Sequence, residues 1–443
     1  MRDMSRRDLL KSMAYSALAL PILGKSKIEK IPPALENSPG EPALQPIPPK
    51  GLHRERLDRL MRGAGIDAIL ASTRNNIGYL TDMYLGMGDR FTAIQNYAIY
   101  AQGNDIISFV GELDWCMGEL LDCDLDHVSL HLSEGAWYNS FSGPLSERDQ
   151  RMVALMKRRY SPGLDPGDTG ALIEAIQEKK LENAVVGVED KMSMKALDAI
   201  KKEFPKMHIR NASSLLESTR SVKNRHELDS MIQATKISAR ALDETHQALT
   251  AGMSSEEIRD LLAKNLRKMG GSNPGVSADI GVYPNRQLGY KLKRGDLVVL
   301  DAVNSVNHRF GDLGMSRVFE GKASDKLSNS HKALSNGIQA CREAARPGIT
   351  ITDLCNAILK GIQDYYPGYS RSRNVFGHSV GIECPEIPIL TLGNQTVLEP
   401  GMVLNPDILV YDYGSYMLLV ENTILVTEKG CELVTDIERT LSA

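Results

Sequence analysis

Short apolar runs alternate with amphipathic stretches along the first half of the chain. In residues 52–65 the apolar side chains recur at helical spacing and end at a glycine, which predicts a surface helix. The same pattern predicts a strand at 67–72, a loop with a short helix at 74–83, paired strands at 97–102 and 105–111, a strand at 183–190 and a helix at 191–204. Strands that alternate with helices predict an α/β domain. The aperiodic residues 133–165 are expected to form a surface excursion from it.

Four long amphipathic stretches dominate the second half, which begins near a junction at 221–231. They predict helices at 227–249, 254–271, 325–348 and 349–366. Ser254 or Ser255 is expected to cap the second helix, because side-chain oxygens accept hydrogen bonds from the free amides of a first helical turn. Thr352 or Asp353 is expected to lie near the cap of the fourth helix. Apolar strands lie between and after these helices. We therefore expect an α/β domain over 51–214 and an α+β domain over 215–443.

Carboxylates interrupt the apolar strands of the second half. Asp301 follows the run Leu-Val-Val-Leu, and Asp312 comes after it around a predicted hairpin. Glu421 lies between the runs Met-Leu-Leu-Val and Thr-Ile-Leu-Val. A carboxylate inside a buried strand needs a partner, because burying a lone charge is costly. The alternative for Asp301 and Asp312 is a pair of exposed hairpin acids.

Two further segments add side chains of the kind that bind metals. His378 follows Gly377, and a glycine there lets the backbone approach a metal or substrate closely. A structural histidine is the alternative. Asp407 ends the segment Leu-Glu-Pro-Gly-Met-Val-Leu-Asn-Pro-Asp. Four carboxylates and one imidazole suit one or two divalent ions such as Mn²⁺, Co²⁺, Fe²⁺ or Zn²⁺. The predicted metal ligands are Asp301, Asp312, His378, Asp407 and Glu421.

The order of these segments resembles the pita-bread metallopeptidase family, which includes methionine aminopeptidases, Xaa-Pro aminopeptidases, prolidases and creatinase-like relatives. The matching segments are LVVLDA, FGDLG, FGHSVGIE, LEPGMVLNPD and VENTILVTEKG. The resemblance covers roughly residues 215–440 and, more loosely, 50–210. It implies a creatinase-like N-terminal α/β domain before an α+β pita-bread catalytic domain, in which paired helices surround a curved antiparallel sheet. It also implies a metal-dependent hydrolase of the Xaa-Pro aminopeptidase or prolidase type, acting on a dipeptide-like or small amide substrate.

Three departures from the family pattern bear on the chemistry. The family's fourth ligand is glutamate, and here Asp407 is one methylene shorter. A second histidine of the family stands where this chain has Pro385, and the stretch before Asp301 contains no histidine. Those imidazoles hold the scissile carbonyl and move protons in the peptidases, so their absence argues against ordinary peptide hydrolysis. Asp407 is the expected general base. Tyr283, His308 and a bound water are the candidates for proton delivery, although a hairpin tip is the alternative position for His308.

These departures leave three functions open. The first is the hydrolase of a dipeptide-like or small amide substrate. The second is a member of the family without peptidase activity, either a creatinase-like C–N hydrolase or a metal-dependent lyase on a small zwitterion. The third is a non-catalytic binding homologue. Metal content separates the third from the others, and a panel of substrates separates the first two.

The length and charge of the chain limit the kinds of molecule that it is expected to bind. A chain of 443 residues exceeds what one hydrophobic core usually organises, and a net charge of −4 with a pI of about 6.2 offers no footprint for nucleic acid. We expect a small molecule or short peptide as the substrate and no membrane span other than a retained signal. The family resemblance implies a homodimer. Of the 6 cysteines, Cys384 alone adjoins a ligand motif, and simple packing is its alternative role.

The N-terminus has the pattern of a targeting segment. The sequence Ser5-Arg6-Arg7-Asp8-Leu9-Leu10-Lys11, followed by a modest apolar run, resembles a twin-arginine export signal. A basic, amphipathic first helix is the alternative. We expect residues 1–24 to send the folded protein to the periplasm or another extracytoplasmic space, with the signal either cleaved or kept as an anchor. Residues 25–50, rich in Pro, Glu, Ser and Lys, predict an extended tether.

Overall fold

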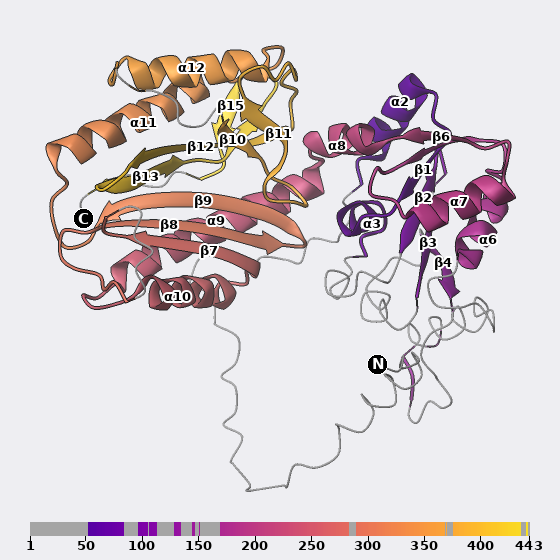
Figure 1. The fold of residues 1–443 in the computed structure, drawn as a ribbon, viewed down its shortest axis with the longest axis horizontal. Coiled ribbons are helices and arrows are strands. Elements are labelled where there is room, and N and C mark those ends of the chain that lie inside the picture. Colours follow the sequence, from indigo (N-terminus) through magenta and orange to yellow (C-terminus); the bar gives the residue numbers. More distant parts are fainter. Residues whose placement is uncertain are drawn as a thin grey trace, which may run out of the picture. The chain divides into compact units, whose positions relative to one another are not determined.

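The computed structural model describes residues 52–83, 96–104, 106–112, 128–133, 144–146, 150, 169–282, 289–367, 369, 375–435 and 440–441 (Figure 1). The predicted signal at 1–24, the tether at 25–50, Tyr283 and most of the predicted excursion at 133–165 lie outside these residues. Among the described residues, none of the helices combines the length and the apolar character that crossing a membrane requires.

A six-stranded mixed sheet forms the centre of the N-terminal domain (Figure 1). Its strands, in spatial order, are β4 Val128–Ser133, β3 Ile107–Glu112, β2 Tyr97–Ala101, β1 Ala68–Ala71, β5 Val185–Val188 and β6 His208–Asn211. The central strand β1 pairs in parallel with β5 and antiparallel with β2. The helices of this part are α2 Arg54–Ala64, α3 Arg74–Thr81, α6 Gly170–Glu178, α7 Met194–Glu203 and α8 Ser213–Ser221. The predicted α/β class is confirmed.

Alternate side chains of β1 enter hydrophobic clusters on opposite faces of this sheet. Ile69 and Ala71 belong to one cluster, and Ala68 and Leu70 to the other. Because both faces are covered, the strand is an unbroken apolar run rather than an alternating one. The edge strand β6 was not predicted, because three of its four residues are exposed and carry no apolar signal. Residues His208–Asn211 form a strand because their backbone pairs with β5, and no apolar pattern in their own sequence indicates it.

The described residues of the catalytic domain form four helices and two sheets. The helices are α9 Arg225–Gln247, α10 Ser255–Lys268, α11 Asp325–Ala344 and α12 Ile351–Gln363. Ser254 caps α10 in a capping box, as one of the two predicted residues. Thr352 and Asp353 lie in the first turn of α12, near its cap as predicted. Thr350 is its N-cap, and Asp353 is the reciprocal partner that binds back to the Thr350 backbone amide.

The strands of the catalytic domain fall into two antiparallel sheets (Figure 1). The first, in the order β7-β8-β9, contains β7 Ser272–Ile280, β8 Leu297–Val306 and β9 Arg309–Val318. The second, in the order β11-β10-β12-β14-β15, contains β11 Glu386–Thr391, β10 Val375–Ser379, β12 Val403–Asp412, β14 Ile424–Val426 and β15 Cys431–Leu433, with β13 Tyr416–Glu421 also paired to β12. Helices α9 and α10 share a core with the first sheet, and α11 and α12 share one with the second.

The two sheets meet where β9 runs beside β13. The Ser316 hydroxyl donates to the Leu419 carbonyl at 2.8 Å and accepts from the Leu419 amide at 3.0 Å, so a side chain takes the place of a backbone ladder. Gly314, two residues before Ser316, leaves the room for this approach. A Cβ atom at position 314 would lie 2.2 Å from Leu419 Cδ2 and 2.6 Å from Glu421 Oε2. The junction therefore brings Glu421 to the inner face of the first sheet.

Candidate metal centre

The hairpin of β8 and β9 directs two aspartates to one face of the sheet. Asp301 is opposite Gly314, and Asp312 is opposite Val303. Cross-strand partners point to the same face, and so do residues two apart on a strand, so Asp301 and Asp312 share a face as diagonal neighbours. The two-residue turn at Asn307 and His308 sets this register, since both residues have positive φ, as a type I′ turn requires.

Strands β12 and β13 present a second pair of carboxylates. Asp407 and Glu421 are directly opposite each other in the ladder and so point to one face. The Asn405 side-chain amide donates to Glu421 Oε1, and the Thr423 hydroxyl donates to Asn405 Oδ1 at 2.6 Å. Thr423 thus holds the Asn405 side chain, and Asn405 in turn orients the Glu421 carboxylate.

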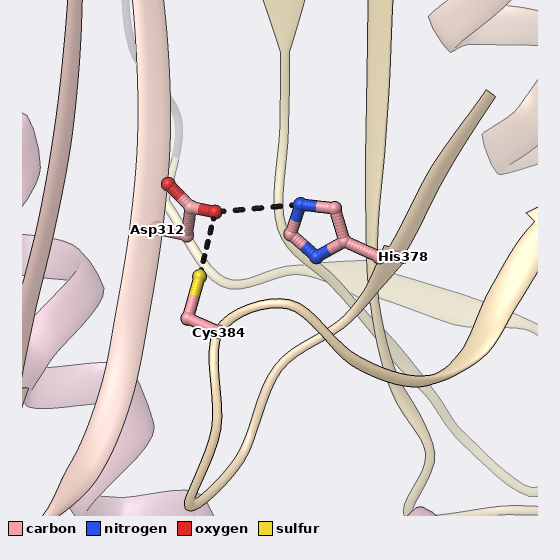
Figure 2. Close-up of side chains that lie close together, drawn as sticks. All are labelled: Asp312, His378 and Cys384. Atoms are coloured by element: carbon pink, nitrogen blue, oxygen red, sulfur yellow. Dashed lines mark hydrogen bonds and ion pairs between the residues drawn. The ribbon is translucent and has the colours of Figure 1, made fainter. Parts of the chain in front are cut away.

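Strand β10 brings His378 beside Asp312 (Figure 2). His378 Nε2 lies 3.5 Å from Asp312 Oδ2, and Nδ1 lies 2.9 Å from the Ser379 carbonyl. A carbonyl oxygen only accepts hydrogen bonds, so Nδ1 carries a proton and Nε2 is the nitrogen that faces Asp312, the orientation usual for metal-binding histidines. Gly377 has a φ of +135°, and a Cβ there would lie 2.1 Å from the Asn405 carbonyl oxygen. Only glycine lets β10 approach β12 this closely.

Cys384 completes the group in Figure 2. Its thiol donates to Asp312 Oδ2 at 3.0 Å. Ligand-type atoms of Asp312, His378 and Cys384 all lie within 4.8 Å of one another, and so do those of Asp301, Asp312 and Glu421. Asp312 belongs to both groups. A carboxylate shared between two sets of ligands is what a pair of neighbouring divalent ions requires.

The electrostatics of the centre favour a bound cation. Burial, together with the charges of Asp312 and Asp407, raises the pKa of Asp301 well above its usual range. Burial also raises the pKa of Asp312, although the Cys384 thiol and His378 oppose that rise. Asp301 Oδ1 and Asp312 Oδ1 are buried, and neither accepts a hydrogen bond from the described residues. Buried acidic oxygens without donors need a proton or a metal ion, so these side chains fit divalent ions.

Four of the five predicted ligands therefore lie in the two groups. Asp407, the fifth, is opposite Glu421 in the ladder and joins neither group of the described residues. His308 is exposed at the tip of the β8–β9 hairpin, the alternative position weighed for it. Tyr283 lies outside the described residues. Cys384 is the member that sequence reasoning placed beside the motif without assigning a role.

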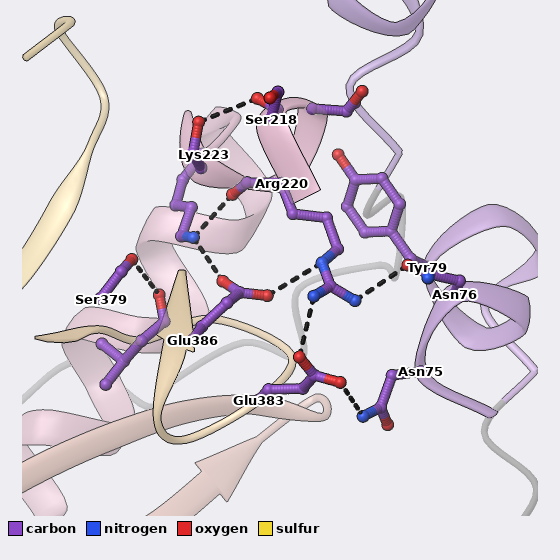
Figure 3. A network of polar contacts seen from close by, with 12 residues as sticks. Asn75, Asn76, Tyr79, Ser218, Arg220, Lys223, Ser379, Glu383 and Glu386 are labelled. Carbon is purple, nitrogen blue, oxygen red and sulfur yellow. Dashed lines mark hydrogen bonds and ion pairs between the residues drawn. The ribbon is translucent and has the colours of Figure 1, made fainter. Parts of the chain in front are cut away.

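A buried ionic network supports the segment that carries Cys384 (Figure 3). Arg220 pairs with Glu383 Oε2 at 2.8 Å and with Glu386 Oε1 at 3.0 Å, and its side chain is 5% exposed. Lys223 Nζ lies 2.6 Å from Glu386 Oε2, with both side chains fully buried or nearly so. Asn75 donates to the other oxygen of Glu383. Both glutamates flank the segment Cys384-Pro385, so the network positions that segment on both sides.

No local pattern revealed Arg220 or Lys223 as buried. Both belong to the polar junction at 221–231 or its immediate neighbourhood, where charged residues are usually exposed. Burial alone would lower the pKa of Arg220, but the carboxylates of Glu386 and Glu383 raise it. The only available signal was the pair of glutamates around Pro385, which needed basic partners from elsewhere.

Comparisons with known proteins bear on this centre. Residues 229–428 match the model of metallopeptidase family M24. An Xaa-Pro dipeptidase of Pyrococcus furiosus is 25% identical over 276 residues, which cover 60% of this chain and 78% of that protein. Ectoine hydrolase of Halomonas elongata is 24% identical over 408 residues, covering 86% of this chain and 94% of that protein. The crystal structure of X-Pro aminopeptidase from Thermotoga maritima MSB8 has a TM-score of 0.68 at 20% identity and covers 88% of this chain and 99% of that one. The fold of an N-terminal domain followed by a pita-bread domain is thereby confirmed.

Proposed function

We propose, on the premise that residues 229–428 belong to metallopeptidase family M24, that this protein hydrolyses a C–N bond in a dipeptide-like or small amide substrate with the help of divalent metal ions. The observation that carries the proposal is the sharing of Asp312 between two groups of ligand atoms. Asp301 and Glu421 complete one group, and His378 belongs to the other. When bound, the ions supply an activated water and polarise the substrate carbonyl.

Hydrogen bonds within the protein hold the proposed ligand side chains in place. The Nδ1 hydrogen bond of His378 holds the imidazole with Nε2 facing the centre. Asn405 holds Glu421 in the same way through its amide. Asp407, on the face of Glu421, is the proposed general base that takes a proton from the attacking water. Mn²⁺, Co²⁺, Fe²⁺ and Zn²⁺ are the candidate ions, and elemental analysis of protein purified without chelator identifies them.

A non-peptidase C–N hydrolase acting on a small zwitterion is the second candidate. It is favoured by Pro385, which occupies the position of a family histidine, and by the similarity to ectoine hydrolase over 86% of the chain. A metal-dependent lyase on such a substrate and a non-catalytic binding homologue are the remaining alternatives. A metal-loaded protein that turns over nothing in a broad panel would favour the binding homologue.

We predict weak or absent activity on standard Xaa-Pro dipeptides, even in fully metal-loaded protein. General acid and base groups contribute ~10²–10⁴-fold in rate, and position 385 offers no imidazole to protonate a leaving amine. Initial rates should be measured with Ala-Pro and Leu-Pro, N-acyl amino acids and small cyclic or betaine-like zwitterions, each at a fixed metal content. We expect the highest initial rate with a substrate that has a better leaving group or carries its own proton donor.

Cleavage of Ala-Pro or Leu-Pro with a kcat/KM of about 10⁴ M⁻¹s⁻¹ or more, within the ordinary enzyme range, contradicts this prediction. Proton delivery would then fall to another group, and His308→Ala and Tyr283→Phe would identify it. The matched control for both variants is the exposed Tyr413→Phe, which lies in the turn between β12 and β13.

We also propose export through the twin-arginine route, supported by Arg6-Arg7 and the apolar run that follows. Replacing both arginines by lysine should hold the protein in the cytoplasm, because lysine keeps the charge but not the guanidinium geometry. Fractionation of cells that express the wild type and the double variant measures this, with Lys25→Arg as the control for a neutral change in a basic residue. Undiminished export of the double variant contradicts the proposal.

A homodimer is the proposed assembly, on the resemblance to longer members of the family. Analytical ultracentrifugation of the purified protein measures it.

A further inference from the structure

The shorter side chain at position 407 affects how many protein ligands an ion beside His378 would have. Aspartate reaches about 1.5 Å less far than the glutamate that the family resemblance implies there, the length of one C–C bond. Asp407 joins neither group of ligand atoms among the described residues. Asp312 and His378 alone would leave an ion with two protein ligands, whereas a catalytic zinc ion usually has three.

The Cys384 thiol is a third potential metal ligand beside Asp312 and His378. Cys384 Sγ lies 3.0 Å from Asp312 Oδ2, and His378 Nε2 lies 3.5 Å from the same oxygen (Figure 2). A tetrahedral ion with a metal–sulfur bond of about 2.3 Å and metal–nitrogen or metal–oxygen bonds of about 2.0–2.1 Å separates its ligand atoms by roughly 3.3–3.6 Å. The nitrogen–oxygen separation agrees with this spacing, and the sulfur–oxygen separation is about half an ångström shorter, because the thiol is hydrogen-bonded to the carboxylate.

We infer that Cys384 is a direct ligand of the ion held by Asp312 and His378, in place of the donor that a glutamate at position 407 would supply. The inference rests on the proposed function, because it concerns the same metal centre. On binding, the thiol loses its proton to solvent and the sulfur forms the bond to the metal. The sulfur, the imidazole nitrogen and the carboxylate oxygen would be the three protein ligands of this ion, the number that a catalytic site with room for water or substrate usually has.

The charges of the two groups agree with this assignment. Asp301, Asp312, Glu421 and a Cys384 thiolate would supply four negative charges for two divalent cations, and Asp407 would keep its own charge for the role of general base. The inference also separates the two positions chemically. The all-carboxylate group suits a hard ion such as Mn²⁺, whereas a thiolate beside an imidazole favours Zn²⁺, Co²⁺ or Fe²⁺.

The ionic network of Figure 3 supplies the rigidity that such a ligand needs. Glu383 and Glu386 stand on either side of Cys384-Pro385, and Arg220 and Lys223 hold them. A ligand on a segment fixed at both sides loses little further conformational freedom when the ion binds. The alternative role for Cys384 is a thiol that merely donates a hydrogen bond to Asp312.

Cobalt substitution distinguishes the two roles. Full-length protein is stripped with chelator, titrated with Co²⁺ and followed by absorption spectroscopy, because a thiolate ligand adds a near-ultraviolet charge-transfer band that carboxylates and imidazoles do not produce. The wild type and the control variant Cys431→Ser should show the band, since Cys431 lies on β15 and contacts the Arg342 carbonyl. Cys384→Ser should lose it and bind Zn²⁺ at least ~10-fold more weakly, the range seen when a metal site loses a supporting group.

X-ray absorption spectroscopy of the zinc-loaded wild type tests the inference without any substitution, so the result does not depend on whether a variant folds. A sulfur scatterer at about 2.3 Å from zinc supports Cys384 as a ligand, whereas a shell of nitrogen and oxygen alone at about 2.0–2.1 Å overturns it. In that second outcome the proposed function stands. Protein that binds neither cobalt nor zinc contradicts the inference, and protein that binds none of Mn²⁺, Co²⁺, Fe²⁺ and Zn²⁺ also contradicts the proposed metal-dependent hydrolysis.

Discussion

Replacing Asp312 with asparagine is expected to empty both metal positions and to lower kcat/KM by about 10³-fold or more. Asp312 belongs to both groups of ligand atoms, so its neutralisation weakens both ions at once. Removing a single electrostatic group from an active site typically costs ~10²–10³-fold in rate, and here the loss includes the activated water as well. Mass spectrometry of the metals and initial rates on the best substrate of the panel measure the two effects.

The same variant should not destabilise the metal-free protein. Burial raises the pKa of Asp312, which shows that its charged form is unfavourable without a cation, and asparagine keeps the shape and the acceptor for the Cys384 thiol. Thermal unfolding in chelator should therefore give a midpoint equal to or above that of the wild type. Asp412→Asn, on the exposed pair with Lys326 at the end of β12, is the matched control and should keep its metal. Equal metal in wild type and Asp312→Asn would refute the proposed centre.

Replacing Arg220 with methionine is expected to cost about 1–3 kcal/mol in the free energy of unfolding. The substitution keeps much of the side-chain volume but leaves Glu383 and Glu386 without the guanidinium that pairs with both. Glu386 is 1% exposed, so water cannot replace the guanidinium at Oε1, although Lys223 still pairs with Oε2. The midpoint of urea unfolding measures the loss, and the cobalt spectrum reports whether the segment of Cys384 shifts.

Arg225→Met provides the contrast. Arg225 forms an ion pair of similar length, 2.9 Å, with Asp229 four residues on, but its side chain is 82% exposed. Exposed pairs of this kind contribute about 0.3–0.5 kcal/mol, because water screens the charges and solvates the partner that remains. Similar unfolding midpoints for the two variants would mean that the network around Glu386 does not stabilise the fold.

Local pattern was sufficient for most helices and strands. Periodic apolar residues and a capping serine predicted α10, and an apolar run followed by aspartate predicted β8 and the first acid of the hairpin. These signals succeed because a helix face or a strand end is decided by residues a few positions apart. The pattern failed at β6, where a polar edge strand depends on its neighbour. At α12 it indicated the neighbourhood of the cap, where Asp353 takes part in the capping box, but not that Thr350 is the N-cap.

The sequence by itself determined which side chains could form a metal centre, because a carboxylate inside an apolar strand needs a partner and the ordered set resembles one family. Tertiary structure alone decided how they meet. The type I′ turn places Asp301 and Asp312 on one face, and the contact of β9 with β13 brings Glu421 to them. It also decided that Cys384 faces Asp312 while His308 is exposed at a hairpin tip. The stability of a buried charge depends on partners more than a hundred residues away, such as Lys223 for Glu386, and no local window of sequence contains both.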